Sequence, residues 1–440
     1  MAPLYDTLRI EYGKCPPDCS ACEQACAKEK GGSNGNIVRI RALHVPQANF
    51  HGAVTCIQCS QPRCQQVCLA GAIERSQLDG VVRIDESKCV GCGMCALACL
   101  YGGIYRDPVT YKSFKCDMCD GEPKCVQACP YHVLSHIKND PIQRYLKEED
   151  QLTPGSTLCP GCAAELALRF TLRVLGKNTI LFTAPSCLAT TLMGLDTQAG
   201  VRLACLSSLF TNTASVLTGI KRYYQHIGRE VNVVAFVGDG ATADIGFQAL
   251  SGAAERGENI IYICYDNEGY MNTGIQRSST TPLRAWTTTS PVGKTTQGKE
   301  QPAKNMPLIM AAHEVAYVAT ATVAYLEDYA KKLTRAMEIK GGLAYIHLHS
   351  PCVVGWRAPS ESAINICRLA VETNYFPLWE YEGGEYRFTH TVDGPKPMTE
   401  YVKLMQKFSH LDEAGIAELQ QLVNSRFDTI RSLTEITQRH

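Results

Sequence analysis

The 440-residue sequence lacks a net charge and a long apolar run. Its 43 basic and 43 acidic residues cancel, so no overall field favours nucleic acid or an anionic membrane surface. The longest apolar-looking stretch, residues 180–195, is interrupted by Thr183, Pro185 and Ser186, and is too short and polar to span a bilayer. The sequence shows no signal-peptide pattern. We therefore expect a cytoplasmic protein with no nucleic-acid and no membrane partner.

Cysteine, by contrast, is abundant, with 23 in the chain. Sixteen of them form four groups of four, and each group ends with two cysteines four positions apart. A C-x-x-C loop lets two thiolates bind one iron-sulfur cubane, while a cysteine four positions further typically binds the second cluster of a pair. The spacing therefore predicts four [4Fe-4S] clusters. The groups are Cys15, Cys19, Cys22 and Cys26; Cys56, Cys59, Cys64 and Cys68; Cys89, Cys92, Cys95 and Cys99; and Cys116, Cys119, Cys125 and Cys129.

Two other cysteine chemistries fit parts of this pattern. Paired C-x-x-C loops also build zinc sites with four thiolates, although zinc does not need the added C-x-x-x-C spacing. Disulfides require an oxidising compartment, which a chain with no signal peptide does not indicate. We expect iron-sulfur clusters, with zinc as the main alternative.

The cysteine-rich region spans residues 1–138 and is expected to form a ferredoxin-like domain. Short β-like connectors, such as residues 81–84, join its cysteine groups. The pattern changes after this region. Residues 139–156 are charged, contain two prolines and lack cysteine, which predicts a linker. From residue 157 to 440, apolar strand and helix signals alternate, and this alternation predicts an α/β domain. A helix is expected near its end, at residues 412–437.

The clearest unit of the α/β region spans residues 231–265. A valine-rich strand, a Gly-Asp-Gly turn, a helix and a second apolar strand follow one another, which predicts a βαβ unit and a parallel sheet. Residues 277–305 are polar and too long for a routine connection, so they form a lid, a partner-binding loop or a solvated excursion. We expect strands at 231–237, 260–265 and 344–348 and a helix at 243–254.

The Gly-Asp-Gly turn, Gly238 to Gly240, lies where a strand ends and a helix begins. Free backbone N–H groups and the helix dipole favour a phosphate group at such a place. Magnesium bound to a diphosphate needs a carboxylate and further oxygen ligands. Asp239 offers the carboxylate, and the next parallel strand brings the Asn267 side chain and the Gly269 carbonyl beside it. The alternative is an unrelated Rossmann-like turn.

The segments GDGATADIGFQAL and YDNEGYMNTG resemble the thiamine diphosphate motif. Residues 158–411 as a whole resemble the β subunit of 2-oxoacid:ferredoxin oxidoreductases. This resemblance implies magnesium held by Asp239, Asn267 and the Gly269 carbonyl, and it places Asn272 beside the cofactor as the candidate catalytic residue. The implied cofactor-binding residues are Gly238, Asp239, Gly240, Asn267, Gly269 and Asn272.

The same family carries a proximal [4Fe-4S] cluster with dispersed ligands. A thioredoxin-like dithiol is the alternative for a C-x-x-C near an α/β pattern, but the two further cysteines at family positions argue against it. Cys264 lies in an apolar strand and is expected to be a small core residue. The implied ligands of the proximal cluster are Cys159, Cys162, Cys187 and Cys352.

The cysteine-rich region resembles the four-cluster ferredoxin subunits of molybdenum oxidoreductases and formate-linked complexes. In that family the last cysteine of a group binds the cluster of another group. One departure is the three-residue separation of Cys15 and Cys19, filled by Pro-Pro-Asp. Carried onto this chain, the implied sets are Cys15, Cys19, Cys22 and Cys129; Cys26, Cys116, Cys119 and Cys125; Cys56, Cys59, Cys64 and Cys99; and Cys68, Cys89, Cys92 and Cys95.

Together the resemblances imply the β subunit of a CoA-dependent 2-oxoacid oxidoreductase. Bound thiamine diphosphate provides the electron sink for decarboxylation, and five clusters would carry single electrons to ferredoxin or to a flavin and NAD subunit. The family's α subunit contributes a Glu next to the cofactor, so we expect an obligate hetero-oligomer with α- and γ-type partners.

The expected substrate is an aromatic 2-oxoacid, phenylglyoxylate, because the added ferredoxin domain resembles the arrangement in anaerobic aromatic metabolism. Pyruvate, indolepyruvate, 2-oxoglutarate and oxalate are alternatives, since they would require similar motifs in this subunit. A pure electron-transfer subunit with a non-catalytic thiamine site is the alternative from another functional class. The intact Asp239, Asn267 and Asn272 argue against it.

Overall fold

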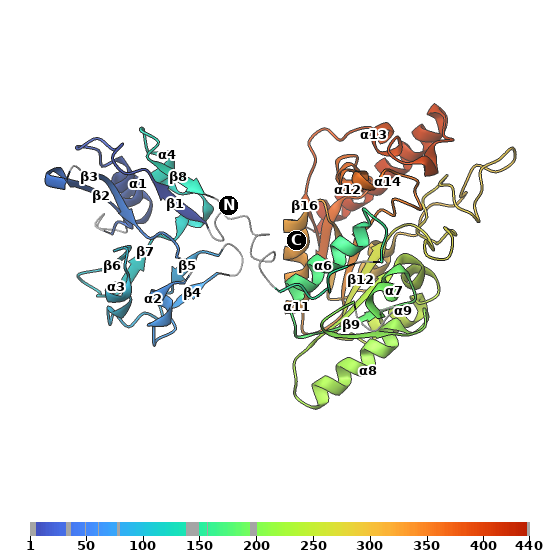
Figure 1. Cartoon of the computed structure of the whole chain (residues 1–440), viewed down its shortest axis with the longest axis horizontal. Helices are drawn as coiled ribbons and strands as arrows, with labels where there is room; N and C mark the ends of the chain where they lie inside the picture. Colours follow the sequence, from blue (N-terminus) through green and yellow to red (C-terminus); the bar gives the residue numbers. More distant parts are fainter. Residues whose placement is uncertain are drawn as a thin grey trace. The chain divides into compact units, whose positions relative to one another are not determined.

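The computed structural model describes most of the chain and divides it into two compact units, Met1–Lys147 and Glu148–His440 (Figure 1). Of the expected linker, residues 139–148 and 156 lie outside the described residues. Among the helices that are described, none combines the length and hydropathy needed to cross a bilayer. The described residues are 6–31, 37–48, 50–59, 61–76, 80–137, 149–155, 157–193 and 200–437.

The first unit consists of short helices and two-stranded antiparallel sheets. The third cysteine of each group lies in a short helix, and the fourth lies in the same helix or just after its end, so the helix separates the fourth thiol from the first two. The helices are α1 (Ala21–Lys30), α2 (Arg63–Gln66), α3 (Met94–Ala98) and α4 (Lys124–Gln127). The strand pairs are β1 (Thr7–Ile10) with β8 (Leu134–Ile137), β2 (Ile40–Val45) with β3 (Phe50–Thr55), β4 (Ile73–Arg75) with β5 (Val82–Ile84), and β6 (Ile104–Arg106) with β7 (Ser113–Lys115).

The second unit is an α/β domain built on a sheet of eight strands. Six strands are parallel, and the last two form an antiparallel hairpin at one edge. The spatial order is β10 (Ala204–Ser207), β9 (Thr179–Thr183), β11 (Asn232–Gly238), β12 (Ile261–Asp266), β14 (Ala344–His349), β13 (Tyr317–Thr322), β15 (Leu378–Glu382) and β16 (Glu385–His390).

Burial along the strands follows from this order. Every residue of β12, β13 and β14 is buried, as expected for parallel strands covered on both faces. Strand β16 alternates between exposed and half-buried residues, which is typical of an edge strand with one covered face. The C-terminal helix α14 (Glu413–Thr437) packs against that edge through the rings of Phe388 and Phe427, 5.3 Å apart.

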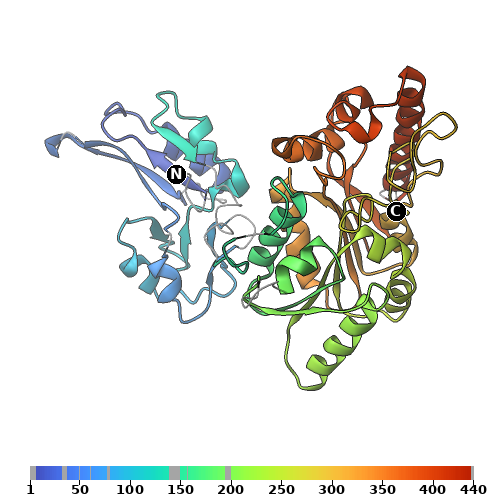
Figure 2. The same cartoon turned by 45° about the vertical axis from the view of Figure 1, so that its right-hand side comes forward.

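Helices cover both faces of the sheet (Figures 1 and 2). On one face α8, α9 and α10 share an apolar cluster with the strand residues Phe182, Tyr262 and Tyr345. On the other face α6 and α11 pack together through Phe170 and Tyr329, whose ring centroids lie 6.0 Å apart. The helices are α6 (Ala163–Leu175), α7 (Cys187–Met193), α8 (Thr213–His226), α9 (Phe247–Glu255), α10 (Met306–Ala312), α11 (Leu326–Glu338), α12 (Ala363–Glu372) and α13 (Met398–Val402).

The βαβ unit expected at residues 231–265 is present, with β11 and β12 as parallel neighbours. Its helix begins later than expected, because the chain first makes a wide turn over Gly240–Asp244, closed by the Ile245 amide donating to the Gly240 carbonyl at 3.2 Å. Such π-type turns are frequent at functional sites. The strands expected at 81–84 and 344–348 are confirmed as β5 and β14, and the final helix as α14.

A hydrogen bond between α6 and α11 generates a stability prediction. The Thr171 hydroxyl donates to the Ala167 carbonyl at 2.7 Å, so it accepts from the Tyr329 hydroxyl, 2.5 Å away. Thr171→Val strands a buried hydroxyl and should lower the unfolding free energy by about 1–3 kcal/mol, whereas Tyr329→Phe leaves Thr171 bonded and should cost less.

Denaturation of the anaerobically purified chain checks this ordering. Thr218→Val is the matched control, because the Thr218 hydroxyl donates only a bond of the same type within α8, to the Ala214 carbonyl at 2.9 Å. The double variant Thr171→Val/Tyr329→Phe should be more stable than Thr171→Val alone. Equal losses for both single variants would contradict the assigned donor.

Candidate active site

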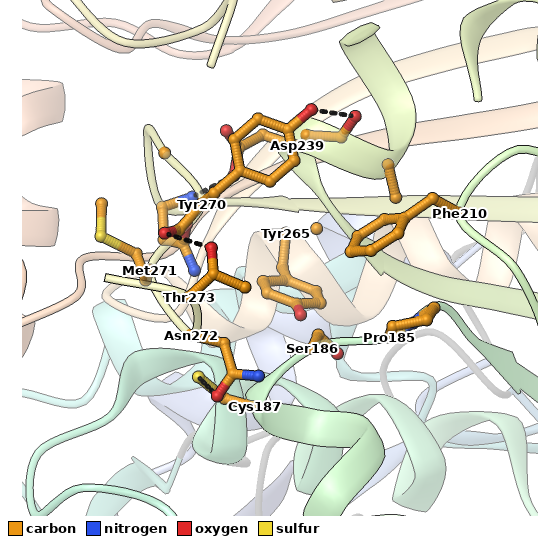
Figure 3. Close-up of a pocket in the computed structure, with 15 residues that line it drawn as sticks. Pro185, Ser186, Cys187, Phe210, Asp239, Tyr265, Tyr270, Met271, Asn272 and Thr273 are labelled. Atoms are coloured by element: carbon orange, nitrogen blue, oxygen red, sulfur yellow. Dashed lines mark hydrogen bonds between the residues drawn. The ribbon is translucent and has the colours of Figure 1, made fainter. Parts of the chain in front are cut away.

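A cavity of about 110 Å³ opens beyond the carboxyl ends of β9, β11 and β12 (Figure 3). Its walls come from the start of α7, from the Gly-Asp-Gly turn and from residues 265–273. Ligands of open parallel sheets bind at this edge, because the strand ends and helix N-termini converge there. The predicted phosphate-binding turn therefore lines a cavity at the edge of the sheet where open parallel-sheet proteins bind their ligands.

The Asn267 side-chain amide lies beside Asp239 and the Gly269 carbonyl at one side of this cavity. With its nitrogen facing them, the amide donates to Asp239 Oδ1 at 3.0 Å and to the Gly269 carbonyl oxygen at 2.8 Å. With a cation bound, half a turn of the amide would present its oxygen there instead. In an octahedral magnesium site with bonds of 2.0–2.1 Å, neighbouring oxygens lie about 2.9 Å apart. With its oxygen turned toward them, the Asn267 amide would have the spacing of a magnesium ligand next to Asp239 Oδ1 and next to the Gly269 carbonyl oxygen.

The charge balance around Asp239 fits a cation as well. Asp239 is 1% exposed, and burial, with the nearby Asp266 carboxylate, raises its pKa well above the usual range. Burial also opposes ionisation of Asp266, but the interactions with His347 and the hydrogen bonds from the Glu268 amide and Thr280 together outweigh this, so the pKa of Asp266 is lowered. Asp266 is therefore stabilised as a carboxylate by its protein partners, whereas ionised Asp239 would be stabilised by a cation bound beside it.

Thr280, from the long segment before α10, bridges the two carboxylates. Its hydroxyl lies 2.9 Å from Asp239 Oδ2 and 2.9 Å from Asp266 Oδ1. The segment is held in place by Lys299, whose ammonium donates to the Ser279 carbonyl at 3.0 Å and to the Thr281 carbonyl. Since Thr280 and Lys299 are both buried, this part of the segment is not a solvated excursion.

A second buried network fixes the backbone of Asn267. The Trp356 indole donates to the Asn267 carbonyl at 2.9 Å, and the Lys407 ammonium lies 3.2 Å from the Trp356 ring centroid. Lys407 also pairs with buried Glu268, which accepts from the Tyr375 hydroxyl at 2.6 Å. Sequence reasoning missed Thr280, Trp356, Tyr375 and Lys407, because they lie outside the motif or far from it in the chain.

The three glycines of the motif differ in how much room the structure leaves for a side chain. A Cβ at Gly240 would lie 2.4 Å from the Tyr270 ring, so a side chain there would displace this ring. A Cβ at Gly269 would lie 2.9 Å from the Gln276 carbonyl oxygen. At Gly238 the nearest atom would be 3.4 Å away, so no steric argument requires glycine at that position.

Asn272 lies at the cavity wall in contact with a cysteine. The Cys187 thiol donates to Asn272 Oδ1 at 3.4 Å, and Figure 3 shows the two side chains end to end. A residue predicted to lie beside the cofactor thus touches a residue predicted to bind the proximal cluster. This contact would place a one-electron acceptor directly against the cavity.

Four cysteines from three separate segments meet at this place. Cys159 and Cys162 precede α6, Cys187 begins α7, and Cys352 follows β14. Burial, together with the three other thiols, raises the pKa of Cys352 to about 11. Thiolates grouped in this way require a positively charged partner, which the iron and sulfide core of a cluster would provide.

The first unit groups its cysteines in the same manner. Burial raises the pKa of Cys22 to about 11 and that of Cys125 to about 12, and neighbouring thiols add to both shifts. The neighbours of Cys22 include Cys15, Cys19 and Cys129. Those of Cys125 include Cys26, Cys116 and Cys119. Burial raises the pKa of Cys64 to about 11 as well, with contributions from Cys56 and Cys99.

Two cysteines of the remaining set contact one serine. The Cys95 thiol donates to Ser113 Oγ at 3.2 Å, the Ser113 amide donates to Cys89 Sγ at 3.5 Å, and Cys68 belongs to the same apolar cluster as Cys95. Across the described ranges, no three His, Cys, Asp or Glu side chains converge as a single metal ion would require. The thiolates of a cubane lie further apart, because each binds a different iron atom.

Comparison with known proteins identifies both units. Residues 187–348 match the thiamine pyrophosphate enzyme, C-terminal TPP binding domain. Residues 48–139 match the 4Fe-4S dicluster domain, which begins after the first cysteine group. Thiamine diphosphate and iron-sulfur clusters are therefore confirmed as the cofactors, while the number of clusters stays a prediction.

One relative covers both units. The chain is 44% identical to the β subunit of NADH-dependent phenylglyoxylate dehydrogenase from Aromatoleum evansii, over 99% of each chain. It is 49% identical to pyruvate synthase subunit PorB from Methanothermobacter marburgensis, over 65% of this chain and 99% of that one. Ketoisovalerate oxidoreductase subunit VorB from Pyrococcus furiosus is 42% identical, over 66% of this chain and 94% of its own.

These matches confirm the family that the thiamine and cysteine motifs indicate. They span the Asp239 turn and the residues that follow β12, and the full-length relative also spans the four cysteine groups. The chain belongs to the β subunits of the thiamine diphosphate-dependent, iron-sulfur 2-oxoacid oxidoreductases.

Proposed function

We propose that this chain serves in an enzyme that converts phenylglyoxylate and coenzyme A to benzoyl-CoA and carbon dioxide, releasing two electrons and one proton. The observation behind this proposal is the share of the chain that each relative matches. The relative named for phenylglyoxylate matches 99% of the chain, including the cysteine-rich unit. The pyruvate and ketoisovalerate relatives match 65% and 66%, which leaves that unit without a counterpart.

Pyruvate is the second candidate substrate. PorB shares 49% identity over its aligned part, compared with 44% for the full-length relative. The aligned part of PorB has the length of the α/β unit, which carries the thiamine site. Similarity of this unit therefore favours pyruvate slightly, whereas the domain arrangement favours phenylglyoxylate.

Within the thiamine site, we assign magnesium to Asp239 Oδ1, the Asn267 side-chain oxygen and the Gly269 carbonyl. The contacts of the Asn267 amide with Asp239 Oδ1 and the Gly269 carbonyl, 3.0 and 2.8 Å, support this assignment, and so does the burial of Asp239 near a second carboxylate, Asp266. The backbone of Gly238 and Gly240 would receive the diphosphate, and Asn272 would contact the cofactor. Bound thiamine diphosphate provides the electron sink that decarboxylation needs.

Five [4Fe-4S] clusters complete the proposal. Four lie in the first unit, and one is held by Cys159, Cys162, Cys187 and Cys352. The grouping of the thiols supports the ligand sets inferred from the four-cluster ferredoxins. We assign α- and γ-type partner subunits, because the relatives are themselves named as subunits. The electron acceptor would be a flavin and NAD subunit or ferredoxin, in the cytoplasm, where thiols stay reduced.

Replacing Asp239 by Asn should abolish 2-oxoacid oxidation without destabilising the fold. Asn lacks the charge that magnesium needs, but it also removes a buried carboxyl whose raised pKa shows that its ionisation is unfavourable in the fold. The measurements are bound thiamine, 2-oxoacid-dependent dye reduction and thermal unfolding. The exposed Asp393 is the control, and full thiamine content with normal turnover in Asp239→Asn would refute the magnesium assignment.

Replacing Cys187 or Cys352 by Ser should remove one cluster. With four cysteines for each cubane, the wild-type chain should hold about twenty iron atoms and each variant about sixteen. Turnover should collapse, while the first unit's clusters stay reducible by dithionite. Cys205→Ser is the control, since Cys205 belongs to none of the inferred sets. Wild-type iron content in both variants, or stoichiometric zinc, would disprove these ligands.

Substrate screening of the purified complex tests the reaction itself. With coenzyme A and NAD present, phenylglyoxylate should give a higher kcat/KM than pyruvate, 2-oxoglutarate, indolepyruvate or oxalate. Omitting coenzyme A should stop the reaction. A preference for pyruvate would instead support the second candidate. The full-length similarity would then reflect the electron-transfer role of the first unit and not the substrate.

A further inference from the structure

Lys115, at the end of β7, is a buried cation in the middle of the first unit. It is 3% exposed. Its ammonium donates to the Cys116 carbonyl at 3.0 Å, to the side-chain oxygen of Gln58 at 3.4 Å and to the Val82 carbonyl. Among the residues that the structure describes, no carboxylate pairs with it. All its partners are neutral, so its charge is not cancelled locally.

Lys115 lies between two of the inferred cluster sites. The Cys56 set comprises Cys56, Cys59, Cys64 and Cys99, and the Cys116 set comprises Cys26, Cys116, Cys119 and Cys125. Gln58 links the two, because its amide nitrogen donates to the Cys116 carbonyl at 2.9 Å while its backbone nitrogen donates to Cys56 Sγ at 3.4 Å. Lys115 binds both Gln58 and the Cys116 carbonyl, so its positive charge lies close to both sets of cysteines.

The backbone of Gln58 shows how firmly this bridge is held. Gln58 has φ of +52°, a conformation that is uncommon for residues other than glycine. Its side-chain oxygen also accepts from the Val82 amide at 2.9 Å. A strained residue persists only where its surroundings determine its conformation, and here the surroundings are the loops of two cysteine sets and Lys115.

Electrostatics extends to both sets. Burial raises the pKa of Cys64 to about 11, and Lys115 is the strongest opposing influence. Burial also raises the pKa of Cys116 to about 11, and Lys115 again opposes the shift. A charge that favours a thiolate also favours any added negative charge on the cluster that the thiolate binds.

Other cations near the Cys116 set are paired. Lys30 and Arg39 line the cavity that the four cysteines of this set surround, but both contact Asp117, with Lys30 Nζ 3.1 Å from Asp117 Oδ2. The Asp117 carboxylate offsets much of their charge. Lys115 differs because a lone buried ammonium is costly, and anionic clusters on both sides would compensate for it.

We propose that Lys115 sets the reduction potentials of the two clusters that flank it, raising both together. This inference rests on the cluster assignment proposed above. Reduction adds an electron to a cluster, and a nearby positive charge in a medium of low dielectric constant stabilises the reduced form. Because the ammonium is shared, the two potentials rise in parallel, which keeps neighbouring steps of the electron path matched in energy.

Redox titration of the anaerobic complex, followed by electron paramagnetic resonance, tests the proposal. In Lys115→Met, two of the cluster potentials should fall by at least 59 mV, a tenfold change in a one-electron equilibrium, while the others stay unchanged. Lys115→Arg keeps the charge and should stay near wild type. Lys112→Met is the matched control, since Lys112 precedes the same strand and donates to the Glu86 carbonyl at 2.7 Å.

Iron and sulfide are measured first, because this measurement tests the cluster assignment separately from the role of Lys115. Wild-type protein without iron for the first unit would refute the cluster assignment. Iron-replete Lys115→Met with unchanged potentials, or with all potentials lowered equally, would overturn the role of Lys115, as would an equal fall in Lys115→Arg. Loss of iron from both Lys115→Met and Lys115→Gln would show that Lys115 only holds the loops, and would also overturn the proposal.

Discussion

Buried negative charge that needs a positive partner is the constraint that organises both units. In the α/β unit, three carboxylates lie together beyond the strand ends. Asp266 is hydrogen-bonded to His347 and Glu268 is paired with Lys407, while Asp239 accepts hydrogen bonds from the Thr280 hydroxyl and the Asn267 backbone amide. The protein therefore stabilises two of the three carboxylates through its own side chains, and the third is the one that we assign to the proposed magnesium ion.

The first unit meets the same constraint with thiols. Within the described part of this unit, the α-helices other than α1 have four or five residues and the strands three to six, so regular secondary structure there provides little core. Its two apolar clusters are built partly from cysteines. Metal binding and folding are coupled in small domains of this kind, and burial of the thiols is the structural reason: the same atoms form the core and the ligand shell.

Parallel topology explains how the two chemistries meet. Adjacent parallel strands end at the same edge, so Asp239 after β11 and Asn267 after β12 become neighbours although 28 residues separate them. The start of α7 lies at that edge too and carries Cys187, which contacts Asn272. Under the proposed assignment, one sheet edge therefore carries both Asn272, beside the cofactor, and Cys187, a ligand of the proximal cluster.

The sequence by itself determined the family, the two kinds of unit, the βαβ motif and the cysteine groups, because these depend on short-range spacing: C-x-x-C loops, a Gly-Asp-Gly turn and alternating apolar segments. Only the tertiary structure decided the rest. Thr280, His347 and Lys407 reach the site from distant segments, and Lys115 is one lysine among many until folding buries it between two cysteine sets. Charge compensation acts through space, and spacing along the chain does not report which charges burial will bring together.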